Sequence, residues 1–529
     1  MLTKNKKGYI KNLLKTGLYS IICGILVGIA IFAFKYIAKE LEHLSIYLYN
    51  SSKTYIICIV FIFIALIALA TLMHIIHKSM PEVKGGGIPK SEGVLRGILH
   101  FKSHRTLLGT FLGSILSFFA GVPVGTEGPS VLIGTSIADL CNKTSKKNKA
   151  QSRYVNTGGA AAGFAVATGA PFAGILFALE EIHKRFTPML VVSVSLSVLS
   201  AMFMNISLCN LCDLNYELFH FNILVSFEYK DIIYILILAL LIALSVGCFD
   251  KSVGLLMKLS KKLNNKISPF IKLLALFIIT GILGYTFIDG IYSGHSVIEA
   301  LIINDKDIWY LLLLLLIRLV LMYMVIDSGI TGGIFIPTMT IAATIGAILG
   351  KLLILIGLDE SYFILIVVIT MCAFMGGTLR APLTGAILFF ELTSAFNNMF
   401  YIVLIIFIVN FIVEIFDQPS FYDRVLENME EEEYKNKVRK IDHFTMTVSE
   451  GSYVVGKTVR DVMWPQSLVV LNITRENETM EKLDNDGERK IYAKDKIIFK
   501  CRYYDEEELF NNIYDLVGSD YPIIRQEKK

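Results

Sequence analysis

The stretch Gly125-Thr126-Glu127-Gly128-Pro129 places one carboxylate between two apolar runs, residues 106–124 and 130–139. Proline is tolerated in the first turn of a helix, so the stretch predicts a helix that begins inside the membrane with its free N–H groups exposed. Such a helix end attracts anions through its unpaired donors and the positive end of its dipole. Because Glu127 is itself an anion there, we expect it to compete with a transported anion and to leave when it is protonated.

The composition of the 529-residue chain indicates a membrane protein. It is 54% hydrophobic and 18% charged, with a mean hydropathy of +0.59, whereas soluble domains are about 25% charged. The apolar residues form blocks long enough to cross a bilayer. We therefore predict an all-α polytopic membrane protein. Spans are expected at residues 17–37, 55–77, 190–204, 232–249, 271–288, 308–325, 338–355, 362–375 and 400–416.

Charge and cysteine placement constrain location and function class. Basic runs at residues 4–15, 143–149 and 251–266 favour the cytoplasmic side, so we expect a multi-pass cell-membrane protein with both termini in the cytoplasm and a retained first helix. A net charge of +4 gives no reason to expect nucleic-acid binding. The pair Cys209 and Cys212 could form a disulfide or half a metal site, or remain two separate thiols. We predict no resident metal, no cofactor and no enzymatic activity, because no nucleotide loop, metal cluster or catalytic dyad is found.

Further glycine-rich and proline-rich segments interrupt the apolar blocks. Lys84-Gly85-Gly86-Gly87-Ile88-Pro89 predicts either a bare backbone loop that can approach a ligand closely or a flexible turn. The small-residue run at residues 158–163 favours close helix packing in lipid.

The chain also contains an internal repeat. Pro171 precedes Glu180 by nine residues, and Pro382 precedes Glu391 by the same distance. Upstream, Gly125-x-x-x-Pro129 corresponds in spacing to Gly333-x-x-x-Pro337. Paired interruptions in corresponding halves predict an inverted-topology repeat, with a substrate site where broken helices meet. Within it, we expect Glu180 to pair with a neighbouring cation among residues 183–185, and Glu391 to pair with Arg380.

The last part of the chain changes character. We assign residues 1–426 to the membrane domain, 427–442 to a charged linker and 443–529 to a soluble tail. Alternating apolar and polar residues predict strands at 445–448, 468–473 and 496–500, and a helix follows at 506–517. The tail is therefore expected to be a small α+β domain.

Four elements, at 85–89, 125–129, 332–337 and Gln418-Pro419-Ser420-Phe421-Tyr422-Asp423, resemble in their order the CLC family of chloride channels and proton-coupled anion exchangers. The resemblance implies a homodimer in the lipid bilayer, with one anion pathway in each protomer. By position, Glu127 resembles the gating glutamate, Glu181 the inner proton-transfer glutamate, and Tyr422 the tyrosine whose hydroxyl contacts the central anion.

The resemblance also implies a set of anion-binding backbone groups. They belong to Gly85, Gly86, Thr126, Glu127, Gly128, Ile334 and Phe335. The family usually has serine where Gly86 stands, so a hydroxyl donor is missing and the identity of the anion stays open. The expected function is exchange of chloride, or a similar small anion, for protons. The alternative is a passive anion channel of the same fold, which usually lacks the glutamate at the position of Glu181.

The tail resembles a TrkA-C domain, through residues 449–459 and Ile473-Thr474-Arg475. That resemblance implies a regulatory role and a small nucleotide ligand, in some proteins a cyclic dinucleotide. No Gly-x-Gly-x-x-Gly fingerprint precedes the tail, so an NAD-binding half is not expected. A cation-transport component is disfavoured because no potassium-filter run is present.

Overall fold

The computed structural model describes residues 2–144, 149–263, 267–303, 306–435, 437–475 and 487–526. The helices are α1 (Leu2–Thr54), α2 (Ile56–Ser79), α3 (Gly87–Leu95), α4 (Ser103–Phe119), α5 (Glu127–Thr144), α6 (Lys149–Thr168), α7 (Pro171–Phe177), α8 (Pro188–Leu211), α9 (Ile232–Leu263), α10 (Pro269–Thr286), α11 (His295–Leu301), α12 (Ile308–Ser328), α13 (Phe335–Leu355), α14 (Phe363–Leu379), α15 (Pro382–Thr393), α16 (Met399–Ile415), α17 (Phe421–Glu433) and α18 (Glu506–Val517). The strands are β1 (Lys440–Thr447), β2 (Leu468–Thr474), β3 (Lys496–Tyr503) and β4 (Ile524–Arg525).

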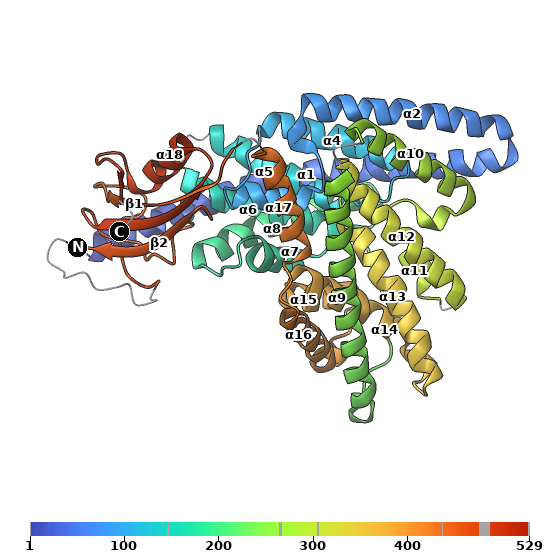
Figure 1. Cartoon of the computed structure of the whole chain (residues 1–529). Helices are drawn as coiled ribbons and strands as arrows, with labels where there is room; N and C mark the ends of the chain where they lie inside the picture. The colour runs from blue at the N-terminus through green and yellow to red at the C-terminus, as the bar shows by residue number, and fades with distance from the viewer. Residues whose placement is uncertain are drawn as a thin grey trace.

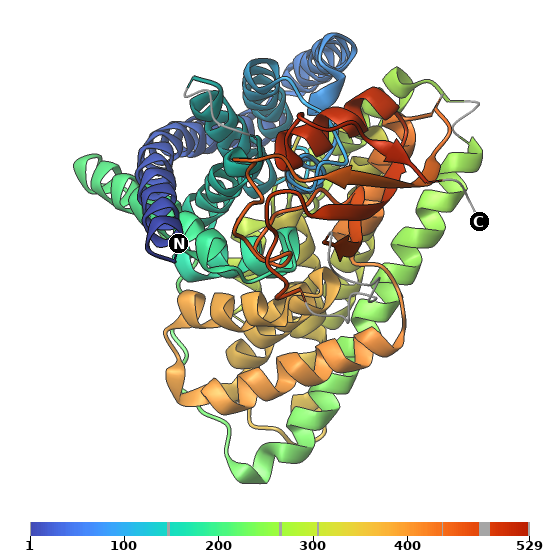
Figure 2. The same cartoon turned by 90° about the vertical axis from the view of Figure 1, so that its left-hand side faces the viewer.

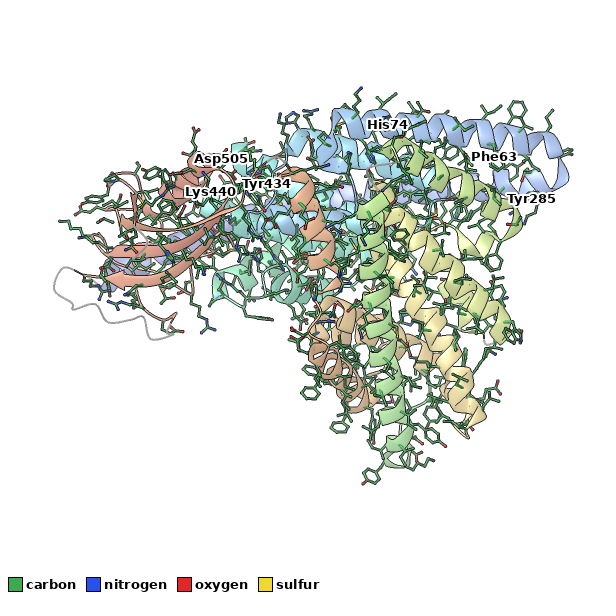
Figure 3. All side chains as sticks on the ribbon, viewed as in Figure 1. Phe63, His74, Tyr285, Tyr434, Lys440 and Asp505 are labelled. Atoms are coloured by element: carbon green, nitrogen blue, oxygen red, sulfur yellow. The ribbon has the colours of Figure 1, made fainter. Side chains whose placement is uncertain are left out.

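Within the described residues, nine helices are long and apolar enough to cross a membrane: α1, α2, α8, α9, α10, α12, α13, α14 and α16. Each overlaps one predicted span, which confirms the helical membrane architecture. In Figure 1, α1 and α2 run crosswise to α9, with the sheet at the opposite end of the molecule from the α1–α2 connection. Figure 3 labels Phe63 and His74 on α2 and Tyr285 on α10, two helices that pack together, and the His74 ring lies 5.3 Å from that of Phe270.

The first helix is longer than predicted. The sequence indicated a span at 17–37, whereas α1 continues through 53 residues. No proline interrupts residues 2–54, and the polar flanks contain many good helix formers. Within its apolar part α1 packs closely on α8, because a Cβ added at Gly28 would lie 2.6 Å from the Ala201 carbonyl oxygen.

The glycine run at 85–87 is only partly a loop, which corrects the prediction of a bare loop through Pro89. Gly85 has φ +82° and donates its N–H to the Gly329 oxygen at 2.8 Å. Helix α3 already begins at Gly87, because Pro89 falls in its first turn, where a missing N–H has no intrahelical partner.

The two carboxylates of the repeat cap each other's halves. Glu391 accepts the N–H groups of Phe172 and Ala173 at 2.7 and 2.8 Å, at the start of α7. Glu180 accepts those of Leu383 and Thr384 at 3.0 and 2.7 Å, at the start of α15. Both expected cation pairings are therefore wrong. The physical reason is that each helix start offers two unpaired backbone donors to the acid of the other half.

Arg380, the cation we expected beside Glu391, instead lies 3.5 Å from Asp250 and 3.6 Å from Glu414. Arg380 has φ +58° and ends α14, so its side chain turns towards α9 and α16. Arg318, also inside the membrane part, donates to the carbonyl oxygens of Asp289, Ile291 and Tyr292.

The C-terminal part forms a separate small sheet domain. Its strand order is β2-β3-β1-β4, with antiparallel pairing, and its apolar residues form their own core around Phe444, Phe499 and Ile513. Helix α18 begins at Glu506, before its first apolar residue, Leu509. It can begin there because Asp505 caps it by accepting the Glu507 and Glu508 N–H groups. Figures 1 and 2 show this domain beside the N-terminal end of α1. We call this end of the molecule the sheet-facing side.

The predicted linker is largely helical. Its acidic residues 427–433 continue α17, which Ser420 caps by accepting the Asp423 N–H at 3.1 Å. Strand β1 begins at Lys440, three residues before the expected start of the tail. Acidic residues thus occupy the end of an amphipathic helix whose apolar face contacts the membrane part through Val425 and Leu426, both buried.

Candidate functional site

Two helix starts meet in the interior, where the sequence repeat predicted a site. Gly125 and Gly333 form an isolated antiparallel bridge, with N–H···O distances of 2.7 and 2.9 Å. Helix α5 begins two residues after Gly125, and α13 begins two residues after Gly333. A Cβ added at Gly128 would lie 2.7 Å from the Gly333 Cα, so this approach requires glycine.

A third helix start joins them. A Cβ added at Gly87 would lie 2.0 Å from the Gly128 oxygen, which places the first residue of α3 directly against α5. A Cβ added at Gly86 would lie 3.6 Å from the Ile334 side chain, an ordinary contact. The N-termini of α3, α5 and α13 therefore converge and present positive dipole ends to one region.

Glu127 lies at this convergence. Its side chain is on the first residue of α5 and is 1% exposed. One carboxylate oxygen accepts from the Thr126 hydroxyl at 3.1 Å, and the backbone N–H of Ile336, in the first turn of α13, also faces the carboxylate. The other oxygen, Oε2, has no hydrogen-bond partner among the described residues. The Glu127 carboxylate therefore lies where the positive ends of the helix dipoles converge.

Tyr422 reaches the same interior from α17. It is 1% exposed, and its hydroxyl has no hydrogen-bond partner in the described chain. It lies within electrostatic reach of both Glu127 and Glu181. Buried hydroxyls usually have hydrogen-bond partners, and the buried hydroxyls of Ser91 and Thr110 also lack one among the described residues.

The aromatic wall beside the site includes Phe335. This buried residue opens α13, and its ring meets that of Phe164 edge-on at 5.1 Å. Phe164 in turn stacks on Phe177 at 4.5 Å. This packing fixes the start of α13, whose N-cap residue is Ile334.

Glu181 lies in a π-helical turn, Ala178–Ile182, that follows α7. Its side chain is fully buried, and neither carboxylate oxygen has a hydrogen-bond partner within the described residues. Single π turns in helices are frequent at functional sites. Here the turn directs Glu181 inward, while Glu180 faces α15.

Sequence reasoning missed the charged network around Glu181. Arg96 donates to the Glu181 and Ile182 carbonyl oxygens, each at 2.8 Å, and its Nη1 lies 2.8 Å from the Asp423 carboxylate. Arg96 also pairs with Glu92, which is fully buried. The spacing of Glu92 and Arg96 by four residues in one helix was a detectable signal.

Lys35 was missed as well. It donates to the Val166 carbonyl oxygen at 3.0 Å and lies within electrostatic reach of Glu127. Its signal was its position as the lone charged residue in the apolar run 17–37.

Metal ligation and cross-linking find no support in the described residues. Cys209 and Cys212 are both free thiols, so the disulfide alternative is excluded in this structure. Among the residues that the structure describes, no group of three His, Cys, Asp or Glu side chains could hold a metal ion.

Comparisons with known proteins identify the family of this chain. A family profile described as "Voltage gated chloride channel" matches residues 68–414. H(+)/Cl(-) exchange transporter ClcA from Salmonella paratyphi B and from Salmonella newport are each 26% identical to this chain over 351 residues, covering 64% of it and 72% of each relative.

Solved structures show the same fold. A slow cyanobacterial Cl-/H+ antiporter has a TM-score of 0.73 at 22% identity, covering 78% of this chain and 98% of that one. A eukaryotic CLC transporter has a TM-score of 0.66 at 21% identity, covering 78% and 74%, and a CLC-type fluoride/proton antiporter 0.63 at 21% identity, covering 78% and 97%. The chain belongs to the voltage-gated chloride channel family, the CLC family.

Proposed function

We propose that this protein is a secondary active transporter that exchanges chloride, or a similar small anion, for protons. The observation that carries the proposal is the placement of Glu127, a buried carboxylate at the converging starts of α5 and α13. The charged Glu127 carboxylate and a hydrated anion cannot both occupy this position. The relatives named as exchangers support the same function.

In the proposed cycle, Glu127 is the gate. When it is charged, it holds the anion position against the helix N-termini. When it takes up a proton, its attraction to those N-termini falls and an anion replaces it. The anion is bound by backbone groups around Gly85, Gly86, Thr126, Gly128, Ile334 and Phe335 and by the Tyr422 hydroxyl.

Glu181 is the proposed proton-transfer site on the sheet-facing side. It is buried next to Arg96, which donates to the Glu181 carbonyl oxygen and whose own carbonyl oxygen accepts from the Gln466 N–H of the sheet domain. An ionisable residue inside a membrane protein marks a proton or substrate route. The two glutamates would then exchange protons through the interior while anions pass Tyr422.

The test is Glu127→Gln in liposomes, with wild type as the reference. Glutamine keeps the shape of the side chain but cannot carry the proton. We expect chloride-driven proton uptake to be abolished. Uptake at the wild-type rate would overturn the mechanism, and a reversal potential that ignores a pH gradient in wild type would show the alternative, a passive channel.

We further propose that residues 1–426 are the transport domain, that 427–442 connect it to the tail, and that residues 443–529 are a TrkA-C-like regulatory domain. The separate core of the sheet domain supports this division. A small nucleotide such as a cyclic dinucleotide is the proposed ligand. Calorimetry on the full chain with cyclic dinucleotides tests it, and absence of heat with every candidate would contradict a nucleotide ligand.

We place both termini in the cytoplasm and propose a homodimer. The N-terminal end of α1 and the sheet domain lie at the same end (Figure 1), and Lys261 near the basic end of α9 pairs with Glu431 of α17 at 2.6 Å. Basic segments therefore gather on the sheet-facing side, as the positive-inside rule requires of a cytoplasmic face. Cysteine labelling from each side of intact cells tests the orientation, and cross-linking in membranes tests the dimer.

A further inference from the structure

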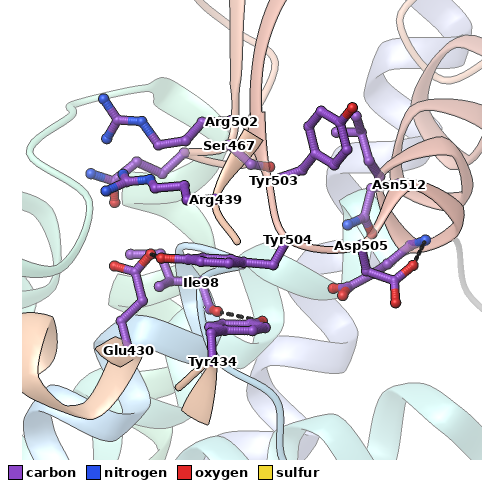
Figure 4. Close-up of a pocket in the computed structure, with 14 residues that line it drawn as sticks. Ile98, Glu430, Tyr434, Arg439, Ser467, Arg502, Tyr503, Tyr504, Asp505 and Asn512 are labelled. Carbon is purple, nitrogen blue, oxygen red and sulfur yellow. Dashed lines mark hydrogen bonds between the residues drawn. The ribbon is translucent and has the colours of Figure 1, made fainter. Parts of the chain in front are cut away.

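A polar cavity of ≈ 670 Å³ lies between the sheet domain and the membrane part. Its walls come from the sheet-facing side of the membrane part, from α17 and from the sheet domain. Seven lysine and arginine side chains line it, against four aspartates and glutamates. Figure 4 shows the neighbouring smaller pocket, which shares Arg439, Arg502 and Tyr504 with it.

Most of the acids in this cavity are already engaged. Asp423 pairs with both Arg96 and Lys184 at 2.8 Å. Glu430 accepts from the Tyr504 hydroxyl at 3.0 Å, and Glu431 pairs with Lys261. These carboxylates therefore neutralise little of the positive charge on the remaining lysine and arginine side chains of the cavity.

Four arginines that line the cavity have no carboxylate partner within the described chain: Arg153, whose side chain donates to the Met463 carbonyl oxygen, and Arg185, Arg439 and Arg502. Arg185 belongs to the membrane part, between the π turn and α8, whereas Arg439 lies in the connecting segment just before β1 and Arg502 lies on β3 of the sheet domain. Figure 4 shows Arg439 and Arg502 extending side by side past the Tyr504 ring, which stacks on Tyr434 at 4.1 Å. Converging guanidinium groups repel each other unless an anion lies between them.

The chemistry of these groups selects the ligand. Guanidinium groups bind phosphate oxygens in a bidentate, charge-assisted way. The cavity is too large for a monatomic ion and falls within the usual range for small-molecule sites, about 300–1,000 Å³. We propose that this interdomain cavity binds a phosphate-bearing small molecule, held by Arg439 and Arg502 on one wall and by Arg185 on the other.

Such a ligand would lie next to the proton-transfer region. The Arg96 carbonyl oxygen accepts from the Gln466 N–H at 3.0 Å, and the Arg96 side chain donates to the Glu181 carbonyl oxygen. A molecule that tightens the contact between the two parts therefore acts on residues that hold the π turn. The inference rests on the proposed regulatory role of the sheet domain and is independent of anion–proton exchange.

The experiment uses the full chain in detergent and calorimetry with three probes: pyrophosphate, ATP and cyclic di-AMP. At least one probe is expected to bind wild type. Arg439→Gln with Arg502→Gln should weaken that binding by at least about tenfold, and Arg185→Gln alone by about tenfold. Lys440→Gln is the matched control, because Lys440 is exposed on the neighbouring position but does not line the cavity; it should bind as wild type does.

The outcomes separate this site from other possibilities. Binding that the double variant loses but Arg185→Gln retains would place the ligand on the sheet domain alone and overturn the interdomain site, while leaving a regulatory domain intact. Failure of all soluble probes, together with binding of phosphatidylglycerol but not phosphatidylcholine micelles that depends on the same arginines, would identify a lipid headgroup as the phosphate source. No binding in any arm would overturn the proposal.

Discussion

Gly125 and Gly333 exchange two backbone hydrogen bonds and so join the two halves of the repeat at the point where each half begins a broken helix. Each residue both donates and accepts, which fixes the register of the two segments. Because α5 and α13 start two residues later, the bridge determines where their free N–H groups lie. The Glu127 carboxylate takes its position from this pairing.

Replacing Glu181 by glutamine should separate the two transported ions. We expect proton transport to fall to background while chloride flux continues, because the proposed anion pathway past Tyr422 does not use the Glu181 carboxylate. Parallel chloride-efflux and pH-electrode measurements on the same liposomes provide the check. The matched control is Glu180→Gln, one residue away and directed to the start of α15, which should retain proton transport. Loss of proton transport in the control alone would refute the assignment.

Gly86→Ser should change anion preference without unfolding the protein. The structure has room for the Cβ, which would lie 3.6 Å from its nearest neighbours. A hydroxyl added at the start of α3 would give an anion at the proposed site a further donor, so we expect the ratio of chloride to nitrate transport to change by several-fold. Flux assays with each anion measure this ratio.

Gly87→Ala is the steric control for that substitution. Its Cβ would lie 2.0 Å from the Gly128 oxygen, a backbone atom that cannot turn aside. We expect a loss of about 3 kcal/mol or more in stability, visible as a fall in melting temperature in detergent. Equal melting temperatures for the two variants would show that the three helix starts do not meet as described.

The reciprocal caps predict a matched pair of stability losses. Glu391→Ala removes the acceptor of two N–H groups at the start of α7, and Glu180→Ala does the same at α15. Each should cost about 1–2 kcal/mol. Glu414→Ala, whose side chain is 71% exposed, should cost almost nothing. Thermal unfolding of the three variants measures the difference, and a loss in Glu414→Ala as large as in the other two would contradict the caps.

His100 should make docking of the sheet domain sensitive to alkaline pH. Hydrogen bonds with Glu433 and Glu508 raise the pKa of His100 to about 9, above its ordinary value of 6.5. A group whose folded pKa is raised contributes stability fully below pH 6.5, and this contribution is lost as pH rises through about 9. Hydrogen exchange of α18, corrected for its intrinsic pH dependence, should show falling protection over this window.

The control for His100 is His100→Gln, which cannot take a proton. In this variant, the hydrogen-exchange protection of α18 should be lower than in wild type near neutral pH and should not change up to pH 9. Protection that falls identically in wild type and in this variant would exclude His100 as the titrating group.

The membrane helices, the repeat and the tail elements were predictable because each rests on local signals. Apolar length located the nine spans, and the helix predicted at 506–517 coincides with α18. The expected partners of Glu180 and Glu391 were wrong because the backbone N–H groups that these carboxylates accept lie in the other half of the repeat. Sequence neighbours such as Arg380 gave no information about a contact made through three-dimensional packing.

The interior charge network was harder to foresee. Arg96, Asp423 and Glu181 come from three distant segments, and only the fold brings them together. The roles assigned to Glu127, Glu181 and Tyr422 remain predictions, although the structure buries all three. The helical form of residues 427–433 was not predicted, because charge alone does not distinguish an exposed connector from the solvent face of an amphipathic helix such as α17.

The crossed caps have a consequence for biogenesis. Glu180 leaves the ribosome 203 residues before Leu383, whose N–H it accepts. At about 5–20 residues per second, the nascent first half waits roughly 10–40 s for the second. During that interval its acid and the open start of α7 both lack their final partners inside the lipid. The membrane-insertion machinery must therefore protect a half whose helix start is not yet capped. Neither half expressed alone can supply the carboxylate that caps its own helix start.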